Sequence, residues 1–219
     1  TREDRFIKKV KIDYPTHQIH KSAPILHRLR SVKHPIELEV MQKACDITKS
    51  GINRLLKFIK PGVWEHHIEA ELAHEFLMNS SRGFAYTPIV ASGKNACVLH
   101  YIENNKECFD GDVILLDVGA EYANYASDLT RCIPVNGKFT PRQKDVYNAV
   151  LHVKTEAEKL LVPGTIMADY HRQVGLLMEE QLVKLNLITI DDIKNQNPDW
   201  PAYKKYFMHG TSHFIGLDT

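Results

Sequence analysis

The chain has 219 residues, of which 43% are hydrophobic and 25% are charged, a composition typical of a globular protein, and its length suits one large domain or one domain plus a fragment of another. Its 28 Lys and Arg residues balance 27 Asp and Glu residues, so the charge gives no reason to expect nucleic acid or an anionic membrane as a partner. No apolar run approaches the roughly 20 residues that span a bilayer, and the charged N-terminus is unlike a secretion signal, so we expect a cytoplasmic protein.

The first segment, residues 1–34, mixes basic and apolar residues and is interrupted by Pro15 and Pro24. This pattern predicts a strand, a loop and a second extended piece from Ile25 to Arg30. The segment has too few apolar residues for a core of its own. We therefore interpret it as a linker or as the tail of a preceding domain.

Two helices are expected next. Proline suits the first turn of a helix, so a long helix is predicted to begin at Pro35 and to end at the Pro-Gly pair at 61–62. A second, amphipathic helix is predicted over residues 65–79, and residues 83–90 are expected to be extended.

A short apolar run from Cys97 to Tyr101 is predicted to be a strand, and His100 stands at its end. A lone histidine in such a position is usually a structural residue. Only an approach to other reactive side chains would make His100 a catalytic candidate.

A pair of carboxylates dominates the middle of the chain. Residues 113–118 form a nearly continuous apolar run that predicts a buried strand, and residues 122–133 predict a second strand beside it. A hairpin that turns between Tyr122 and Ala123 would place Asp117 directly opposite Asp128 on one face. Two buried carboxylates repel each other unless a proton or a cation lies between them, and oxygen ligands suit divalent metals such as manganese, cobalt or zinc.

An internal repeat is also indicated. The capping-box pattern that begins at Thr140 predicts a helix that ends at the Pro-Gly pair at 163–164, and a further helix is predicted over residues 168–185. The order of long helix, Pro-Gly and amphipathic helix thus occurs twice. If the repeat is complete, a second ligand-bearing hairpin should follow Thr219, so we expect the chain to be a fragment.

Two histidines, His209 and His213, stand four residues apart near the end of the chain, with Gly210 and Gly216 around them. The glycines favour a strand or loop over a helix, so the two rings need not converge. Beside a carboxylate pair, we expect at least one of the two histidines to be a metal ligand.

Together these residues carry a family resemblance. The pattern Leu-Asp-x-Gly followed by Asp-x-Thr-Arg around Asp117 and Asp128, and the pattern His-Gly-x-Ser-His-x-x-Gly-Leu-Asp from His209, resemble the pita-bread metallopeptidases, most of all the Xaa-Pro aminopeptidases and prolidases. The resemblance covers residues 35–219 and implies an α+β pita-bread fold with a pseudo-twofold repeat, of which the C-terminal part would be missing. Residues 1–34 are similar to the end of the creatinase-type N-terminal domain of that family.

The resemblance implies a set of metal ligands. Asp117 would bind one metal ion, Asp128 would bridge two, and His213 would be the imidazole ligand. Two further glutamate ligands of the family have no counterpart in this sequence. The implied cofactors are two divalent ions, with manganese favoured over cobalt and zinc.

The resemblance also implies the substrate and the residues that face it. His100 and His209 would act on the substrate, and Tyr86 would lie beside the metal ligands. The expected activity is release of an N-terminal residue before a penultimate proline, and a homodimer is expected.

Four alternatives remain open at this stage. These are a prolidase that cleaves Xaa-Pro dipeptides, a methionine aminopeptidase, a creatinase-like hydrolase of a small molecule, and a metal-free pita-bread module that binds partners. The 219-residue chain by itself is expected to be inactive, since it would hold three of five ligands.

Overall fold

The computed structural model describes residues 2–219, which fall into two units, one reaching Leu38 and the other running from Glu39 to Thr219. The first unit contains helices α1 (Arg2–Asp13) and α2 (Ala23–Ser31), neither of which buries a residue. The prediction of extended structure here is wrong. Phe6, Ile7 and Val10 recur at helical spacing, and Pro24 lies in the first turn of α2, where a missing N–H costs nothing.

The second unit begins with the two predicted helices, α3 (Pro35–Phe58), whose first residues belong to the first unit, and α4 (Glu65–Met78). Gly62 in the turn between them has a φ of +90°, which glycine adopts without strain. A Cβ at Gly51 would lie 2.8 Å from the Phe76 ring, so the glycine lets α3 and α4 pack closely. The apolar stripes of both helices are buried in one core.

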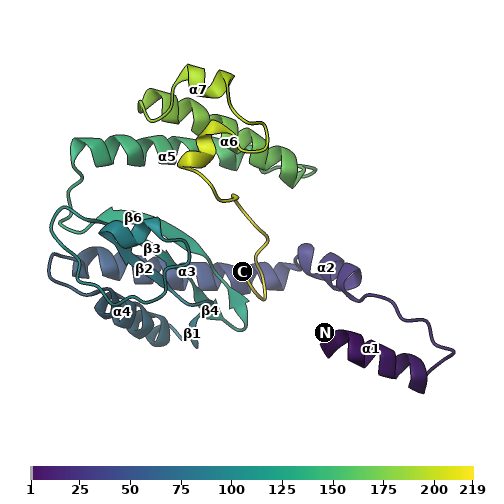
Figure 1. Cartoon of the computed structure of the whole chain (residues 1–219). Coiled ribbons are helices and arrows are strands. Elements are labelled where there is room, and N and C mark those ends of the chain that lie inside the picture. The colour runs from purple at the N-terminus through teal and green to yellow at the C-terminus, as the bar shows by residue number, and fades with distance from the viewer. Residues whose placement is uncertain (1) are drawn as a thin grey trace. The chain divides into compact units, whose positions relative to one another are not determined.

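Two small antiparallel sheets contribute side chains to this core (Figure 1). One has the order β2 (Ile89–Ser92), β3 (Val113–Val118), β6 (Leu129–Pro134), and the other has the order β1 (Gly83–Phe84), β4 (Ala120–Tyr122), β5 (Tyr125–Ala126). Along β3, Ile114, Leu116 and Val118 are buried in the core shared with α3 and α4. Because side chains alternate along a strand, Asp117 points to the opposite face of the sheet.

The hairpin differs from the prediction in register. Ala123 and Asn124 form its two-residue turn, both with positive φ, and the chain that follows is divided into β5 and β6. Asp117 therefore pairs with Thr130, two residues beyond the predicted partner. Asp128 lies in the short stretch of chain between the end of β5 and the start of β6. A shift of two residues leaves each side chain on its expected face, because the period of a strand is two.

The strand predicted from Cys97 to Tyr101 is also wrong. The chain forms a 3-10 helix, η1 (Gly93–Cys97), followed by an irregular loop in which His100 has a φ of +54°. Val98 and Leu99 are 55% and 61% exposed, so this apolar run does not enter the core.

The remaining helices pack around a separate core. They are α5 (Pro141–Leu160), α6 (Met167–Lys184), α7 (Ile190–Lys194) and η2 (Ala202–Lys205). The Thr140–Gln143 capping box is confirmed, and Gly164 has a φ of +92°, close to that of Gly62. The repeated order of long helix, Pro-Gly turn and second helix is thus confirmed. Among the described residues, no helix is both long and apolar enough to cross a membrane.

Candidate metal centre

Asp117 and Asp128 meet at one phenol. The Tyr86 hydroxyl lies 2.7 Å from Oδ1 of Asp117 and 3.0 Å from Oδ1 of Asp128. A hydroxyl has one proton to donate, so it cannot satisfy both carboxylates at the same time. The hairpin thus brings together two acceptor groups that need a shared proton or a cation.

His213 completes the cluster from a distant part of the chain. Its Nε2 lies 3.0 Å from Oδ2 of Asp128, and its Nδ1 lies 2.9 Å from the carbonyl oxygen of Phe214. A ring nitrogen beside a carbonyl oxygen must carry the proton, so in a neutral His213 the lone pair is on Nε2 and faces the carboxylate. This contact is favourable only if the ring is protonated or a cation lies between the two groups.

The segment that carries His213 is fixed to the hairpin by a backbone bond. The N–H of Ala126, in β5, donates to the carbonyl oxygen of Gly216 at 2.7 Å. The hydroxyls of Tyr170, in α6, and Ser212 lie 3.0 Å apart. Figure 1 shows this last segment, in yellow, running from η2 back toward the sheets.

The electrostatics of Asp117 reflect this crowding. Burial raises the pKa of the Asp117 carboxyl, while the hydrogen bond from Tyr86 lowers it. The charge of Asp128 raises this pKa again, and Thr130 and His100 act to lower it. Burial and the two carboxylates together raise the pKa of the Tyr86 phenol far above its usual range. His100 thus acts on the Asp117 carboxyl through its charge alone, and its catalytic role stays a prediction.

Gly119 explains why the motif around Asp117 contains a glycine. A Cβ at this position would lie 1.8 Å from the carbonyl oxygen of Ser127 and 3.0 Å from the ring of Tyr86. No side chain fits there. The glycine lets the chain before Asp128 and the ring of Tyr86 approach Asp117.

Buried hydroxyls hold the two sides of the hairpin together. The Thr48 hydroxyl, on α3, accepts from the N–H of Ala120 at 2.8 Å and lies 2.6 Å from the Ser127 hydroxyl. Ser127 donates to the carbonyl oxygen of Ala120 at 2.9 Å. Thr48 and Ser127 are each 1% exposed, so this network connects α3 to the residue before Asp128.

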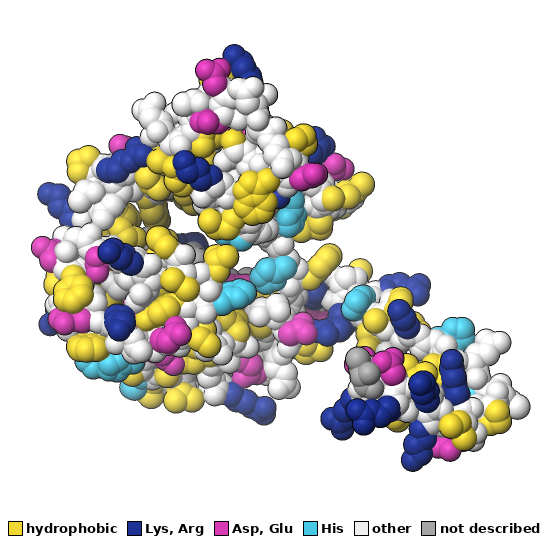
Figure 2. Space-filling model, viewed as in Figure 1, with side chains coloured by type: hydrophobic (Ala, Val, Ile, Leu, Met, Phe, Trp, Pro, Cys, Tyr) yellow, Lys and Arg dark blue, Asp and Glu magenta, His cyan; other side chains and the backbone are white. Residues whose placement is uncertain are grey.

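His209 is not brought to the carboxylates. In the described part of the chain its contacts are with the Gly210 carbonyl oxygen, at 2.8 Å, and with the ring of Phe207. Figure 2 shows histidine side chains beside a hollow in the surface of the second unit. A role for His209 toward substrate stays a prediction.

The predicted ligands have donor atoms that suit a divalent metal, but the structure brings them into contact only two at a time. Within residues 2–219, no set of three His, Cys, Asp or Glu side chains is arranged to hold a metal ion. The predicted ligands Asp117, Asp128 and His213 are oxygen and imidazole donors, which manganese, cobalt and zinc accept. A cation would relieve both the carboxylate pair and the contact of Nε2 with Asp128, so these residues fit the predicted metal.

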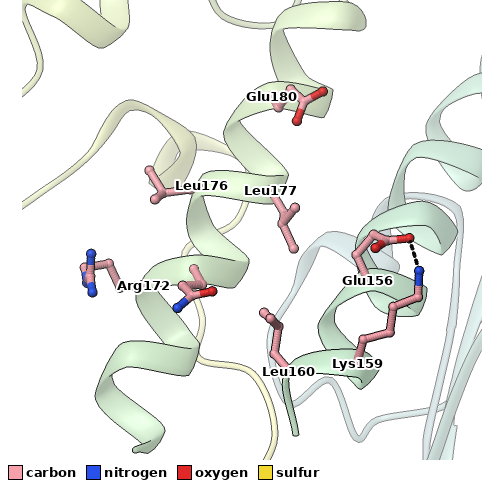
Figure 3. Close-up of a pocket in the computed structure, with 8 residues that line it drawn as sticks. Glu156, Lys159, Leu160, Arg172, Leu176, Leu177 and Glu180 are labelled. Atoms are coloured by element: carbon pink, nitrogen blue, oxygen red, sulfur yellow. Dashed lines mark hydrogen bonds and ion pairs between the residues drawn. The ribbon is translucent and has the colours of Figure 1, made fainter. Parts of the chain in front are cut away.

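A groove between α5 and α6 is a separate feature (Figure 3). It is lined by Glu156, Lys159, Leu160, Arg172, Gln173, Leu176, Leu177 and Glu180. Its charged side chains already form ion pairs at 2.6 to 3.1 Å. None of the predicted site residues lines this groove, and no unpaired charge there points to a ligand.

The supporting residues have no signature in the sequence. Thr48 lies within a helix, and Ser127 is a small polar residue in a hairpin, so neither attracts attention without the fold. Glu65 is an acidic residue in the first turn of a helix, where such residues are common. Only the structure shows that all three are buried and hydrogen-bonded.

Comparison with known proteins gives a consistent result. The sequence model of metallopeptidase family M24 matches residues 39–219. An Xaa-Pro aminopeptidase of Escherichia coli is 41% identical over 197 residues, which are 89% of this chain and 44% of that protein. The Xaa-Pro aminopeptidase 3 of Homo sapiens is 34% identical over 194 residues, 89% of this chain and 38% of that protein. The chain thus spans less than half the length of these relatives.

Solved structures agree with the sequence comparison. A zinc-substituted E. coli aminopeptidase P in complex with product has a TM-score of 0.84 at 40% identity, and the match covers 90% of this chain and 44% of that one. A Bacillus anthracis structure assigned as an aminopeptidase P has a TM-score of 0.90 at 34% identity, covering 100% of this chain and 50% of that one. The expected pita-bread fold is confirmed.

Proposed function

Because the chain belongs to metallopeptidase family M24, we propose that the complete protein is a metal-dependent Xaa-Pro aminopeptidase. The observation that carries the proposal is the contact of the Tyr86 hydroxyl with both Asp117 and Asp128, and of His213 with Asp128, at 2.7 to 3.0 Å. Relatives at 34% to 41% identity that are named Xaa-Pro aminopeptidases support the same substrate class.

In this proposal Asp117, Asp128 and His213 hold two divalent ions, of which manganese is our first choice. Bound divalent ions supply Lewis-acid activation of a water molecule and of the substrate carbonyl. The Tyr86 hydroxyl lies within hydrogen-bond distance of both carboxylates and donates to one of them at a time. The hydrogen bond from Nδ1 of His213 to the Phe214 carbonyl oxygen fixes the ring so that Nε2 faces the metal position.

The substrate explains the need for further donors. The nitrogen of an Xaa-Pro bond carries no N–H, and it must gain a proton when the bond breaks. His100, whose charge acts on the Asp117 carboxyl, would donate a hydrogen bond or a proton on that side of the site. We assign His209 to contact with the substrate as well, and we further propose a cytoplasmic homodimer.

The deciding experiment is hydrolysis of an Xaa-Pro-Yaa peptide by the complete protein, after chelator treatment and after return of manganese, zinc or cobalt. The expected result is release of the first residue only when metal is returned. The Asp117→Asn variant serves as the negative control. Cleavage restricted to Xaa-Pro dipeptides would identify a prolidase, and cleavage of Met-Ala peptides a methionine aminopeptidase. No cleavage by a folded, metal-loaded protein would overturn the proposal.

A further inference from the structure

Among residues 2–219, the most completely buried carboxylate lies outside the predicted metal site. Glu65 is the first residue of α4, and its side chain is 0% exposed. Its Oε1 accepts from the Ser92 N–H at 2.8 Å and from the Asn95 side-chain amide at 3.0 Å. Its Oε2 accepts from the Tyr101 hydroxyl at 2.7 Å and from the Lys106 N–H at 3.0 Å.

Four donors satisfy the acceptor capacity of a carboxylate, which makes the burial of Glu65 tolerable. The backbone of Glu65 adds a reciprocal bond, since its N–H donates to the Lys106 carbonyl oxygen at 2.9 Å. The position at the start of α4 adds the favourable end of the helix dipole. An arrangement this complete fixes the groups around it.

All four donors lie in one segment, from Ser92 at the end of β2 to Lys106, and they lie on both sides of His100. The part of this loop next to His100 is poorly packed, because Val98 and Leu99 are exposed and His100 has a left-handed φ of +54°. A non-glycine residue in that conformation is retained only where its surroundings enforce it. The Tyr101 hydroxyl supplies a tether one residue from His100.

A second buried side chain anchors the far end of the same loop. Asn104 is 3% exposed, accepts from the Val90 N–H at 3.0 Å and donates to the Pro88 carbonyl oxygen at 2.9 Å. It also donates to Glu69 of α4 at 2.9 Å. Two carboxylates of α4 therefore hold the loop, and the partner of Glu65, Tyr101, is nearer to His100 along the chain than the partner of Glu69, Asn104.

We propose that Glu65 is a positioning residue for the reaction: by clamping the loop through Asn95, Tyr101 and Lys106, it fixes the position of His100. The proposal rests on the proposed function, in which His100 acts on the substrate. A purely structural Glu65 would contribute to stability and leave turnover of the folded enzyme unchanged.

The test compares Glu65→Gln with Glu75→Gln in the complete protein. A glutamine at position 65 turns one acceptor oxygen into a donor, so two of the four loop donors lose their acceptor. Glu75 lies on the same helix and accepts from Ser50 at 2.6 Å and from Asn79 at 3.1 Å, away from the loop. The same chemical change is thus made on the same helix, with and without an effect on His100.

Two measurements are made on each variant, and the first does not depend on activity. Hydrogen–deuterium exchange of peptides within residues 93–106 should increase in Glu65→Gln and stay unchanged in Glu75→Gln. For Xaa-Pro-Yaa cleavage by the metal-loaded protein, kcat of Glu65→Gln should fall about 10- to 100-fold with little change in KM. Glu75→Gln should keep the wild-type kcat.

The outcomes separate the two proposals. Faster loop exchange with an unchanged kcat, or an unchanged loop, would overturn the positioning role of Glu65. If the wild-type protein cleaves no Xaa-Pro peptide, the proposed function fails, and the positioning role falls with it even where the exchange data show the clamp. Should Glu65→Gln fail to fold, Tyr101→Phe removes one link of the clamp and must show the same pattern to a smaller degree.

Discussion

His213 Nε2 lies 3.0 Å from Asp128 Oδ2, with the opposite ring nitrogen bound to a backbone carbonyl. A neutral ring therefore points the lone pair of Nε2 at the carboxylate, and a protonated ring points an N–H at it. In the neutral state, a divalent ion between the two groups would bind the lone pair. His209, four residues earlier, is bound to its own neighbour and lies outside this contact. The two histidines of one motif thus have different surroundings.

This difference predicts different effects of the two alanine variants. In the complete protein, His213→Ala should weaken manganese binding by more than about 100-fold, because it removes a predicted ligand rather than a supporting contact. His209→Ala should leave manganese affinity unchanged. Titration calorimetry on both variants checks this, and equal losses would contradict the assignment.

Gly119→Ala should disrupt the site without touching a predicted ligand. The added Cβ would lie 1.8 Å from the Ser127 carbonyl oxygen, so the chain before Asp128 must move. We expect a loss of roughly 1 to 3 kcal/mol in the free energy of unfolding, together with weaker metal binding. Gly137→Ala is the control, since a Cβ there meets nothing within 4 Å, although its φ of +76° adds a backbone strain that Gly119 does not have.

Thr48 offers a test of the buried hydroxyl network. Thr48→Val keeps the shape of the side chain but leaves the Ala120 N–H without its acceptor, which should cost about 1 to 3 kcal/mol of stability. Thr48→Ser keeps the hydroxyl and should lose less. Urea denaturation of the complete protein, followed by fluorescence, measures the difference. A larger loss in Thr48→Ser than in Thr48→Val would show that the methyl group, and not the hydroxyl, carries the effect.

The sequence predicts the site better than it predicts the connections around it. Side chains alternate along β3, so Asp117 lies on the face of the sheet opposite the buried core residues. This prediction depends only on local strand geometry. Its partner in the sheet is Thr130 because the hairpin turns through Ala123 and Asn124, a choice that no propensity rule indicates for an Ala-Asn pair. The buried role of Glu65 depends on four donors in another segment, so no pattern around residue 65 could reveal it.

The hydrogen bond between Tyr101 and Glu65 should make the stability of the protein depend on pH. Burial raises the pKa of the Tyr101 phenol to about 12, and its hydrogen bond to Glu65 acts in the same direction. The unfolded chain loses this proton near pH 10, whereas the folded chain keeps it until about pH 12. In that window the folded state holds a proton that the unfolded state has lost. The stabilisation that the Tyr101 phenol contributes is therefore fully present below pH 10 and is lost as the pH rises toward 12.

Tyr101→Phe should therefore be less stable than the wild type at neutral pH, because it lacks the bond to Glu65, and should lose less stability between pH 10 and 12. Urea midpoints of both proteins across that range give the two slopes, and the tyrosinate absorbance of the folded wild type locates the pKa. The Tyr147→Phe variant controls for loss of a phenol elsewhere, since the Tyr147 ring packs on Phe139. Parallel slopes for Tyr101→Phe and the wild type would show that the Tyr101 phenol is not held by Glu65 in solution.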